Sequence, residues 1–315
     1  MMTHARSYSI RHRPALLIYA LILSLLFPLI AQAQDTDDGD DVVRVNTDLV
    51  VLNVTVTDSE GRYVHGLRRT DFKLFEDGRE QTVDTIASFN DEETPFAAVV
   101  LLDTSGSMES RLSLARSAAI RFLNGLRSED VAAIYSFDAK IEQVQDFSPS
   151  RDLAPVAFNI HARGMTALND AIIRASRELS QREEKRKAII VLSDGMDTYS
   201  KASAGKALES ALAIGATIYT VDMSATGGAA TRNNQSAAAL REFASKSGGR
   251  FVSTPGGPAL RDAFSSIVAE LGNQYTISYR PLNRTRDGRW RSIEVKLSKP
   301  EATARTRKGY RAPKK

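Results

Sequence analysis

The stretch that decides the fold reads AAVVLLDTSGS and runs from residue 97 to residue 107. Its first six residues form a continuous apolar run, which is typical of a strand covered on both faces in a parallel sheet. The remaining five place a carboxylate and two hydroxyls on a short loop, where Gly106 permits a tight bend. The stretch therefore predicts a buried strand that ends in a polar loop.

Strands and helices alternate after this stretch, up to residue 272. Apolar residues at helical spacing, or in short apolar runs, predict helices at 112–126, 168–179, 206–214, 238–247 and 259–271 and strands at 131–137, 188–192, 217–221 and 251–252. This alternation predicts an α/β domain over residues 94–272, with a doubly wound, mainly parallel, Rossmann-like sheet and helices on both faces. Ligands of such sheets bind at the carboxyl ends of the strands, near the point where strand order reverses.

The two flanks of this domain have the pattern of β-structure. Residues 42–93 read as an immunoglobulin-like or sandwich-like segment, with a strand at 49–57 and a hairpin at 72–79. Residues 273–312 contain strand patterns at 274–279, 290–297 and 306–310. Because each flank is too short to bury much core alone, we expect the C-terminal strands to complete the N-terminal segment, with the α/β domain inserted between them.

Residues 1–33 carry the three parts of a secretory signal. Arginines at 6, 11 and 13 precede an apolar run over 15–30, and Ala31-Gln32-Ala33 supplies the small residues of a cleavage site. The alternative is an uncleaved membrane anchor, although a spanning helix needs roughly 20 apolar residues. We expect an exported protein, periplasmic or secreted, that meets a membrane only if the signal stays attached. Residues 34–41, QDTDDGDD, predict a disordered acidic leader.

The net charge and the cysteine content bear on two classes of function: nucleic-acid binding and sites that depend on cysteine. The net charge is +4, and removing the three signal arginines leaves +1 (4 − 3), which gives no basis for nucleic-acid binding. The sequence has no cysteine, so disulfides, zinc–thiolate sites and thiol nucleophiles are excluded.

Three polar segments fall at the same predicted edge of the sheet. DTSGS at 103–107 and SDG at 193–195 follow buried strands, and GMT at 164–166 precedes a helix. The candidate metal ligands in these segments are Asp103, Ser105, Ser107, Thr166 and Asp194. Such an all-oxygen set suits Mg²⁺, with Mn²⁺ and Ca²⁺ as alternatives. Because the set brings few formal charges, a bound cation would keep positive character and recruit an Asp or Glu carboxylate from a protein partner.

Each of these residues also has an ordinary structural interpretation. Asp and Ser are common turn residues, Asp194 could cap a helix, and Thr166 could be the N-cap of the helix near residue 168. Asp138, His161 and Asp197 lie close to the same edge. They are possible rim or ligand contacts, and caps or surface-loop residues are the alternative.

The five candidate ligands and their order resemble the metal-ion-dependent adhesion site of von Willebrand factor type A (VWA) domains and integrin I domains. In that family a D-x-S-x-S loop, a threonine on a second loop and an aspartate after a third strand hold the cation, and all five positions match here. The resemblance covers about residues 94–272 and implies a non-catalytic, metal-dependent protein-binding module. Residues 71–78 and 274–279 resemble the flanks of bacterial exported proteins called VWFA-related.

Two other classes of function stay open. A scaffold in an envelope or secreted assembly would use the metal mainly for structure. A hydrolase would need a nucleophile beside a general base, and Ser105 and Ser107 are the candidate nucleophiles. Metal-assisted hydrolysis by the predicted site itself is the enzyme alternative, and it lacks an obvious general base. After signal cleavage only His65 and His161 could serve, and neither lies in a recognisable catalytic motif. We therefore expect a protein that is not an enzyme.

Overall fold

The computed structural model describes residues 49–87, 94–194, 196–224, 230–254 and 256–314. The described residues all fall in one compact unit, within residues 42–315. The predicted signal and acidic leader lie outside the described residues, so both stay predictions. Among the helices of the described ranges, none combines the length and apolar character needed to span a membrane.

The centre of the molecule is a six-stranded sheet in the order β10-β9-β8-β5-β6-β7. Its strands are β5 (Phe96–Asp103), β6 (Val131–Phe137), β7 (Ile141–Ser148), β8 (Arg186–Ser193), β9 (Ala216–Asp222) and β10 (Phe251–Ser253). All neighbours are parallel except β7, which runs antiparallel to β6. The chain builds outward from β5 to β6 and then crosses to β8. Strand order therefore reverses between β5 and β8, as a doubly wound sheet requires.

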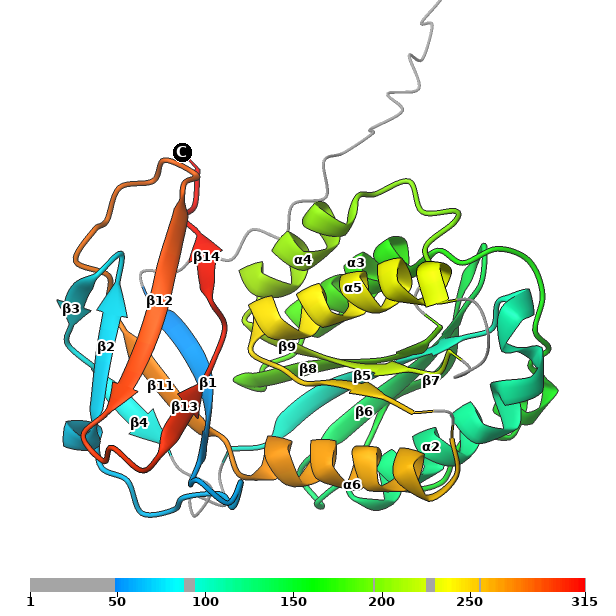
Figure 1. Cartoon of the computed structure of the whole chain (residues 1–315), viewed down its shortest axis with the longest axis horizontal. Coiled ribbons are helices and arrows are strands. Elements are labelled where there is room, and N and C mark those ends of the chain that lie inside the picture. The colour runs from blue at the N-terminus through cyan, green and yellow to red at the C-terminus, as the bar shows by residue number, and fades with distance from the viewer. Residues whose placement is uncertain (1–48, 88–93, 195, 225–229, 255, 315) are drawn as a thin grey trace, which may run out of the picture. The chain divides into compact units, whose positions relative to one another are not determined.

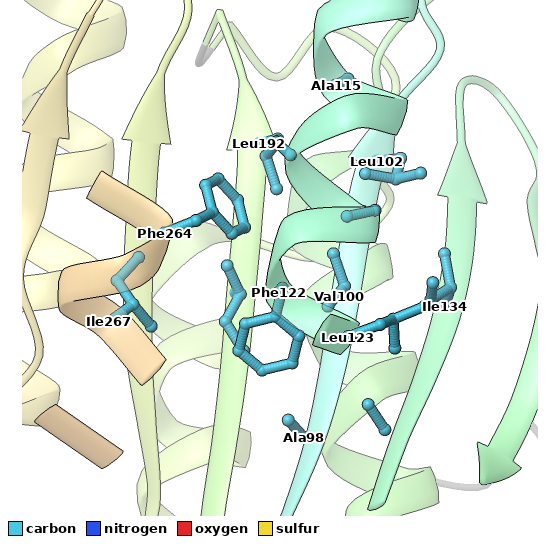
Figure 2. Close-up of a cluster of buried hydrophobic side chains, with 14 of the residues drawn as sticks. Ala98, Val100, Leu102, Ala115, Phe122, Leu123, Ile134, Leu192, Phe264 and Ile267 are labelled. Carbon is cyan, nitrogen blue, oxygen red and sulfur yellow. The ribbon is translucent and has the colours of Figure 1, made fainter. Parts of the chain in front are cut away.

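Helices cover both faces of this sheet (Figure 1). One face carries α2 (Leu112–Asn124) and α6 (Gly257–Gly272), and the other carries α3 (Leu168–Ser180), α4 (Ala204–Ala213) and α5 (Ala230–Ser247). Successive side chains of a strand point to opposite faces, so the apolar run of β5 serves two cores at once. Figure 2 shows one of them, where Val100 and Leu102 of β5 lie with Phe122 of α2 and Phe264 of α6. The predicted α/β fold is confirmed.

Two elements of this domain differ from the sequence prediction. Strand β7 was not predicted, because its sequence IEQVQDFS has few apolar residues and it lies at an edge of the sheet, where much of it is exposed. Helix α5 begins at Ala230, whereas the apolar pattern begins at residue 238. The residues between are mostly polar, so periodicity gives no signal there. Short 3₁₀ helices, η2 (Gly106–Arg111) and η3 (Pro155–Asn159), precede α2 and α3.

The flanking strands form two antiparallel sheets, ordered β13-β1-β11-β4 and β14-β12-β2-β3. The N-terminal strands are β1 (Val50–Thr57), β2 (Phe72–Glu76), β3 (Arg79–Gln81) and β4 (Thr85–Ala87). The 3₁₀ helix η1 (Arg69–Asp71) lies between β1 and β2 in the chain. The C-terminal strands are β11 (Tyr275–Tyr279), β12 (Trp290–Leu297), β13 (Thr303–Arg305) and β14 (Gly309–Arg311). Each sheet mixes strands from both ends of the chain, as expected. One buried cluster takes Leu52 and Ile277 from the first sheet and Leu74 and Ile293 from the second, so the sheets form a sandwich.

Local details of the sandwich follow from a few residues. Asp77 (φ 48°) and Gly78 (φ 77°) both have positive φ, which gives the β2–β3 hairpin the turn that its sequence predicted. The single strand predicted at 306–310 is wrong: residues 306–308 separate the short strands β13 and β14.

A buried polar network joins the sandwich to the α/β domain. Glu270, near the end of α6, is fully buried and accepts hydrogen bonds from the hydroxyls of Tyr219 at 2.8 Å and Thr55 at 3.2 Å. Its carboxylate also pairs with Arg305 at 2.5 Å and with the more exposed Arg250 at 3.1 Å. Strand β1, strand β9 and strand β13 thus meet at one acid on the last helix of the α/β domain.

Candidate metal and ligand site at the carboxyl edge of the sheet

Asp103 is the last residue of β5 and is fully buried. The backbone N–H of Ser105 donates to its Oδ1 at 2.8 Å, and the Ser193 hydroxyl donates to its Oδ2 at 2.5 Å. Ser193 ends β8, the strand on the other side of the point where strand order reverses. Both oxygens of the carboxylate are therefore oriented at the place where doubly wound sheets bind ligands.

The electrostatic surroundings of Asp103 favour a cation. The pKa of Asp103 is raised to about 6, mainly by burial and to a smaller extent by the negative charge of nearby Asp194, while hydrogen bonds from Ser105 and Ser193 oppose the rise. A buried carboxylate near a second one is chemistry that a divalent cation would satisfy.

Backbone hydrogen bonds hold the first two predicted loops together. The N–H of Gly106 donates to the carbonyl of Gly164 at 3.3 Å, and the N–H of Arg163 donates to the carbonyl of Thr104 at 2.8 Å. The hydroxyls of Ser105 and Ser107 lie 3.2 Å apart. Ser105 is buried and Ser107 is exposed, so the pair runs from the sheet edge to the surface.

Part of the third loop, residues 196–203, is joined to Thr166. The N–H groups of Thr198 and Tyr199 donate to the Thr166 carbonyl at 2.9 and 3.0 Å, and the Thr198 hydroxyl accepts from the Thr166 N–H at 2.9 Å. The N-cap of α3 is Ala167, which makes no side-chain cap bond. The Thr166 hydroxyl therefore does not have the capping role that was the alternative to metal binding.

The structure also places the three possible rim residues. Asp138 follows β6, and its carboxylate accepts from the Lys140 N–H at 2.7 Å and lies 3.8 Å from Arg163 Nε. Asp197 accepts from the Asn169 N–H at 2.7 Å and the Ser200 N–H at 3.0 Å, so it caps α3 from another loop.

The imidazole of His161 belongs to an exposed residue of the segment that leads to Thr166. Sequence reasoning missed Ser193, whose only signal was its place between a buried strand and Asp194. It also missed Asp170, in the first turn of α3, which accepts from the N–H groups of Lys201 at 2.9 Å and Ala202 at 3.0 Å. Asp197 and Asp170 together hold residues 197–202 against the start of α3.

Residues 98–196 match the sequence model of a family described as von Willebrand factor type A domain. The chain contains a type A domain. The matched range runs from β5 past the end of β8 and includes every residue predicted to hold the cation. No curated protein matches the chain in sequence.

Several solved structures resemble the chain at low identity. An aerotolerance-related membrane protein from Bacteroides fragilis is 17% identical, with a TM-score of 0.44 over 56% of this chain and 98% of that one. A von Willebrand factor type A protein from Catenulispora acidiphila is 15% identical, with a TM-score of 0.48 over 86% and 75%. The pilus adhesin SpaC from Lactobacillus rhamnosus GG is 10% identical, with a TM-score of 0.49 over 87% and 50%.

Hydroxyls outnumber carboxylates among the predicted cation ligands of the type A domain. In the part of the chain that the structure describes, no group of three or more His, Cys, Asp or Glu side chains lies where it could hold a metal. A cation bound at this edge would thus be held by two carboxylates together with serine and threonine oxygens. Hard cations such as Mg²⁺ accept these ligands and usually retain water in the remaining positions.

Proposed function

We propose that the type A domain binds a divalent cation, Mg²⁺ first and Mn²⁺ or Ca²⁺ second, and uses it to bind a protein ligand. Asp103, Ser105, Ser107, Thr166 and Asp194 would hold the ion. The observation that carries the proposal is the Asp103 carboxylate: it is buried and oriented by two hydrogen bonds, and a second aspartate lies nearby.

The cation would supply a coordination position that an Asp or Glu carboxylate of the partner can enter. Two carboxylates neutralise a divalent ion without surrounding it with surplus negative charge, so a carboxylate of the partner can replace water at an open coordination position. The residues of the chain orient this site and do not react: Ser193 holds Asp103, and Asp197 holds the loop beyond Asp194. Neither histidine candidate lies in a recognisable catalytic arrangement, which favours binding over hydrolysis.

The proposal extends to location and domain limits. An N-terminal signal would export the protein to the periplasm or beyond the cell, and an acidic leader would follow it. The type A domain would span residues 94–272, between β-segments at 42–93 and 273–312 that share one core. The protein would therefore act outside the cytoplasm, at the cell surface or in the envelope, where it would bind a protein and neither bind nucleic acid nor catalyse a reaction.

The metal part of the proposal is tested with thermal unfolding and calorimetry of the whole chain, in Mg²⁺ and after chelation. We expect Mg²⁺ to raise the melting temperature of the parent and to have no effect on Asp103→Asn. Asp222→Asn is the matched control, because Asp222 is also a buried aspartate at a strand end that accepts a backbone N–H two residues on, at 2.8 Å.

Two results would count against the proposal. If Mg²⁺ leaves the parent unchanged in both measurements, the site does not bind the ion. If chelation unfolds the chain at ordinary temperature, the ion is mainly structural, and the scaffold interpretation replaces ligand binding.

A further inference from the structure

Three large hydrophobic side chains are exposed beside the candidate metal ligands. Met165 precedes Thr166 and is 54% exposed, and Met196 and Tyr199 follow Asp194 and are 37% and 54% exposed. We refer to Met165, Met196 and Tyr199 as the apolar rim. Elsewhere in the described ranges, large hydrophobic side chains this exposed occur only at Val156, Phe158, Leu282 and Trp290.

The backbone that carries the apolar rim is fixed to the site. The Tyr199 N–H donates to the carbonyl of Thr166, the residue next to Met165, at 3.0 Å. Asp197, which lies between Met196 and Tyr199, accepts two backbone N–H groups within 3.0 Å. Backbone hydrogen bonds therefore join the two loops, and the large apolar side chains that they carry are exposed. Exposed apolar groups that gather on one surface mark an interaction site.

The composition of the apolar rim fits a protein partner. Methionine and tyrosine are enriched at protein interfaces, methionine because its flexible thioether adapts to different shapes. The charged side chains around the rim include Arg163 and Lys201, both exposed. The acids Asp138 and Asp197 lie near it too: each accepts a backbone N–H group, and Asp138 lies 3.8 Å from Arg163 Nε. The surface thus combines apolar area with charged groups of both signs.

We propose that the ligand is a protein segment whose metal-binding Asp or Glu is flanked by large apolar side chains, which pack on the apolar rim. This inference rests on the proposed function, because the cation positions the acidic residue. It adds the class of partner: a protein segment in which apolar residues flank the acidic residue, and not one in which the acidic residue lies in a polar loop.

The test uses fluorescein-labelled heptapeptides with a central Asp, flanked on both sides either by Leu and Phe or by Ser and Ser. A third peptide carries Asn in place of Asp. Fluorescence anisotropy with the full chain is measured in excess Mg²⁺ and in chelator. We expect the Leu/Phe peptide to bind about tenfold more tightly than the Ser peptide, which corresponds to about 1.4 kcal/mol. The Asn peptide and chelator should abolish binding.

The variants assign the preference to the apolar rim. Met165→Ser with Tyr199→Ser should remove most of the tenfold preference and leave the Mg²⁺-induced rise in melting temperature intact. Val156→Ser with Phe158→Ser is the matched control, since both side chains are 54% exposed on η3, outside the rim. This control should keep the preference.

The failures are distinguishable. If Mg²⁺ stabilises the chain but the Leu/Phe peptide binds no better than the Ser peptide, or does not bind, the apolar-rim proposal is wrong and metal binding stands. If the control pair removes the preference as fully as the rim pair does, the rim is not the docking surface. If Mg²⁺ neither stabilises the chain nor supports any binding, the proposed function fails first.

Discussion

The buried carboxylate of Asp103 lowers the stability of the fold when it is ionised, although the same charge would help to bind a cation. Its pKa in the folded chain is raised to about 6, mainly by burial, whereas an aspartate in an unfolded chain titrates near 3.9. Between these values the folded state binds the extra proton, so stability falls as pH rises and the full cost is present above about pH 6. A cation that pairs with the ionised carboxylate would offset this cost.

The metal-free chain should therefore show a specific pH dependence. We expect Asp103→Asn to be as stable as the parent near pH 4 and more stable above about pH 6, because the asparagine oxygen can accept from the Ser105 N–H and its amide group can donate to the Ser193 hydroxyl, without the buried charge. Melting temperatures of both proteins in metal-free buffers across this range provide the measurement. A parent that gains stability over asparagine as pH rises would show that the charge is favourable without a metal.

Mg²⁺ binding should weaken in acid for the same reason. Protons compete with the cation for Asp103, so the apparent affinity should fall as pH drops through about 6. Calorimetric titrations at about pH 7.5 and about pH 5 compare the two conditions. Equal affinity at both would mean that Asp103 is not a ligand of the ion.

At the scale of elements, the end of α5 depends on close backbone approach. Gly249 follows α5, and a methyl group there would collide with the carbonyl oxygen of Ile218 in β9. We expect Gly249→Ala to destabilise the chain by about 2 kcal/mol or more, because backbone must shift. Gly205→Ala in α4 is the control: the nearest atom is 3.8 Å away, and alanine is the better helix former, so stability should hold or rise slightly. Chemical denaturation of both variants makes the comparison.

The Glu270 network should respond asymmetrically to loss of its arginines. Arg305 pairs with Glu270 and also donates to the carbonyls of Gly248 and Gly249, so Arg305→Met should cost about 3 kcal/mol by leaving the buried carboxylate poorly compensated. Arg250→Met removes a pair whose arginine side chain is 43% exposed and should cost about 1 kcal/mol or less. Equal losses in denaturation experiments would contradict this ranking.

The strands and helices also show which parts of the fold can be predicted from the sequence. The runs before Asp103 and Asp194 predicted β5 and β8 because strands buried on both faces are continuously apolar. Because neighbouring parallel strands end at the same edge of a sheet, the sequence alone predicted that the candidate ligands lie at one edge. No sequence pattern predicted that Asp197 caps α3 or that Glu270 is buried, because each depends on which loop or strand packs nearby. Strand β7 was missed because an edge strand needs few apolar residues.

At the scale of the whole molecule, the sandwich depends on both ends of the chain. Strand β1 pairs with β11, and β2 pairs with β12. We expect deletion of residues 273–315 to remove protection from amide exchange throughout residues 49–87, because their sheets lose central strands and their shared core. Hydrogen exchange with mass spectrometry reads this directly. Retained protection in 49–87 would mean that the N-terminal strands fold on their own.

The pairing of Val50 with Tyr279 carries a consequence for biogenesis. A ribosome, or a secretion channel, releases the N-terminus first, so β1 must wait without its partner until the whole inserted domain has been made. An unpaired strand with an apolar face invites misassembly during that interval. A holding chaperone would be needed most at that stage, and a chain cut short anywhere before residue 275 would leave its first strands as a target for proteolysis.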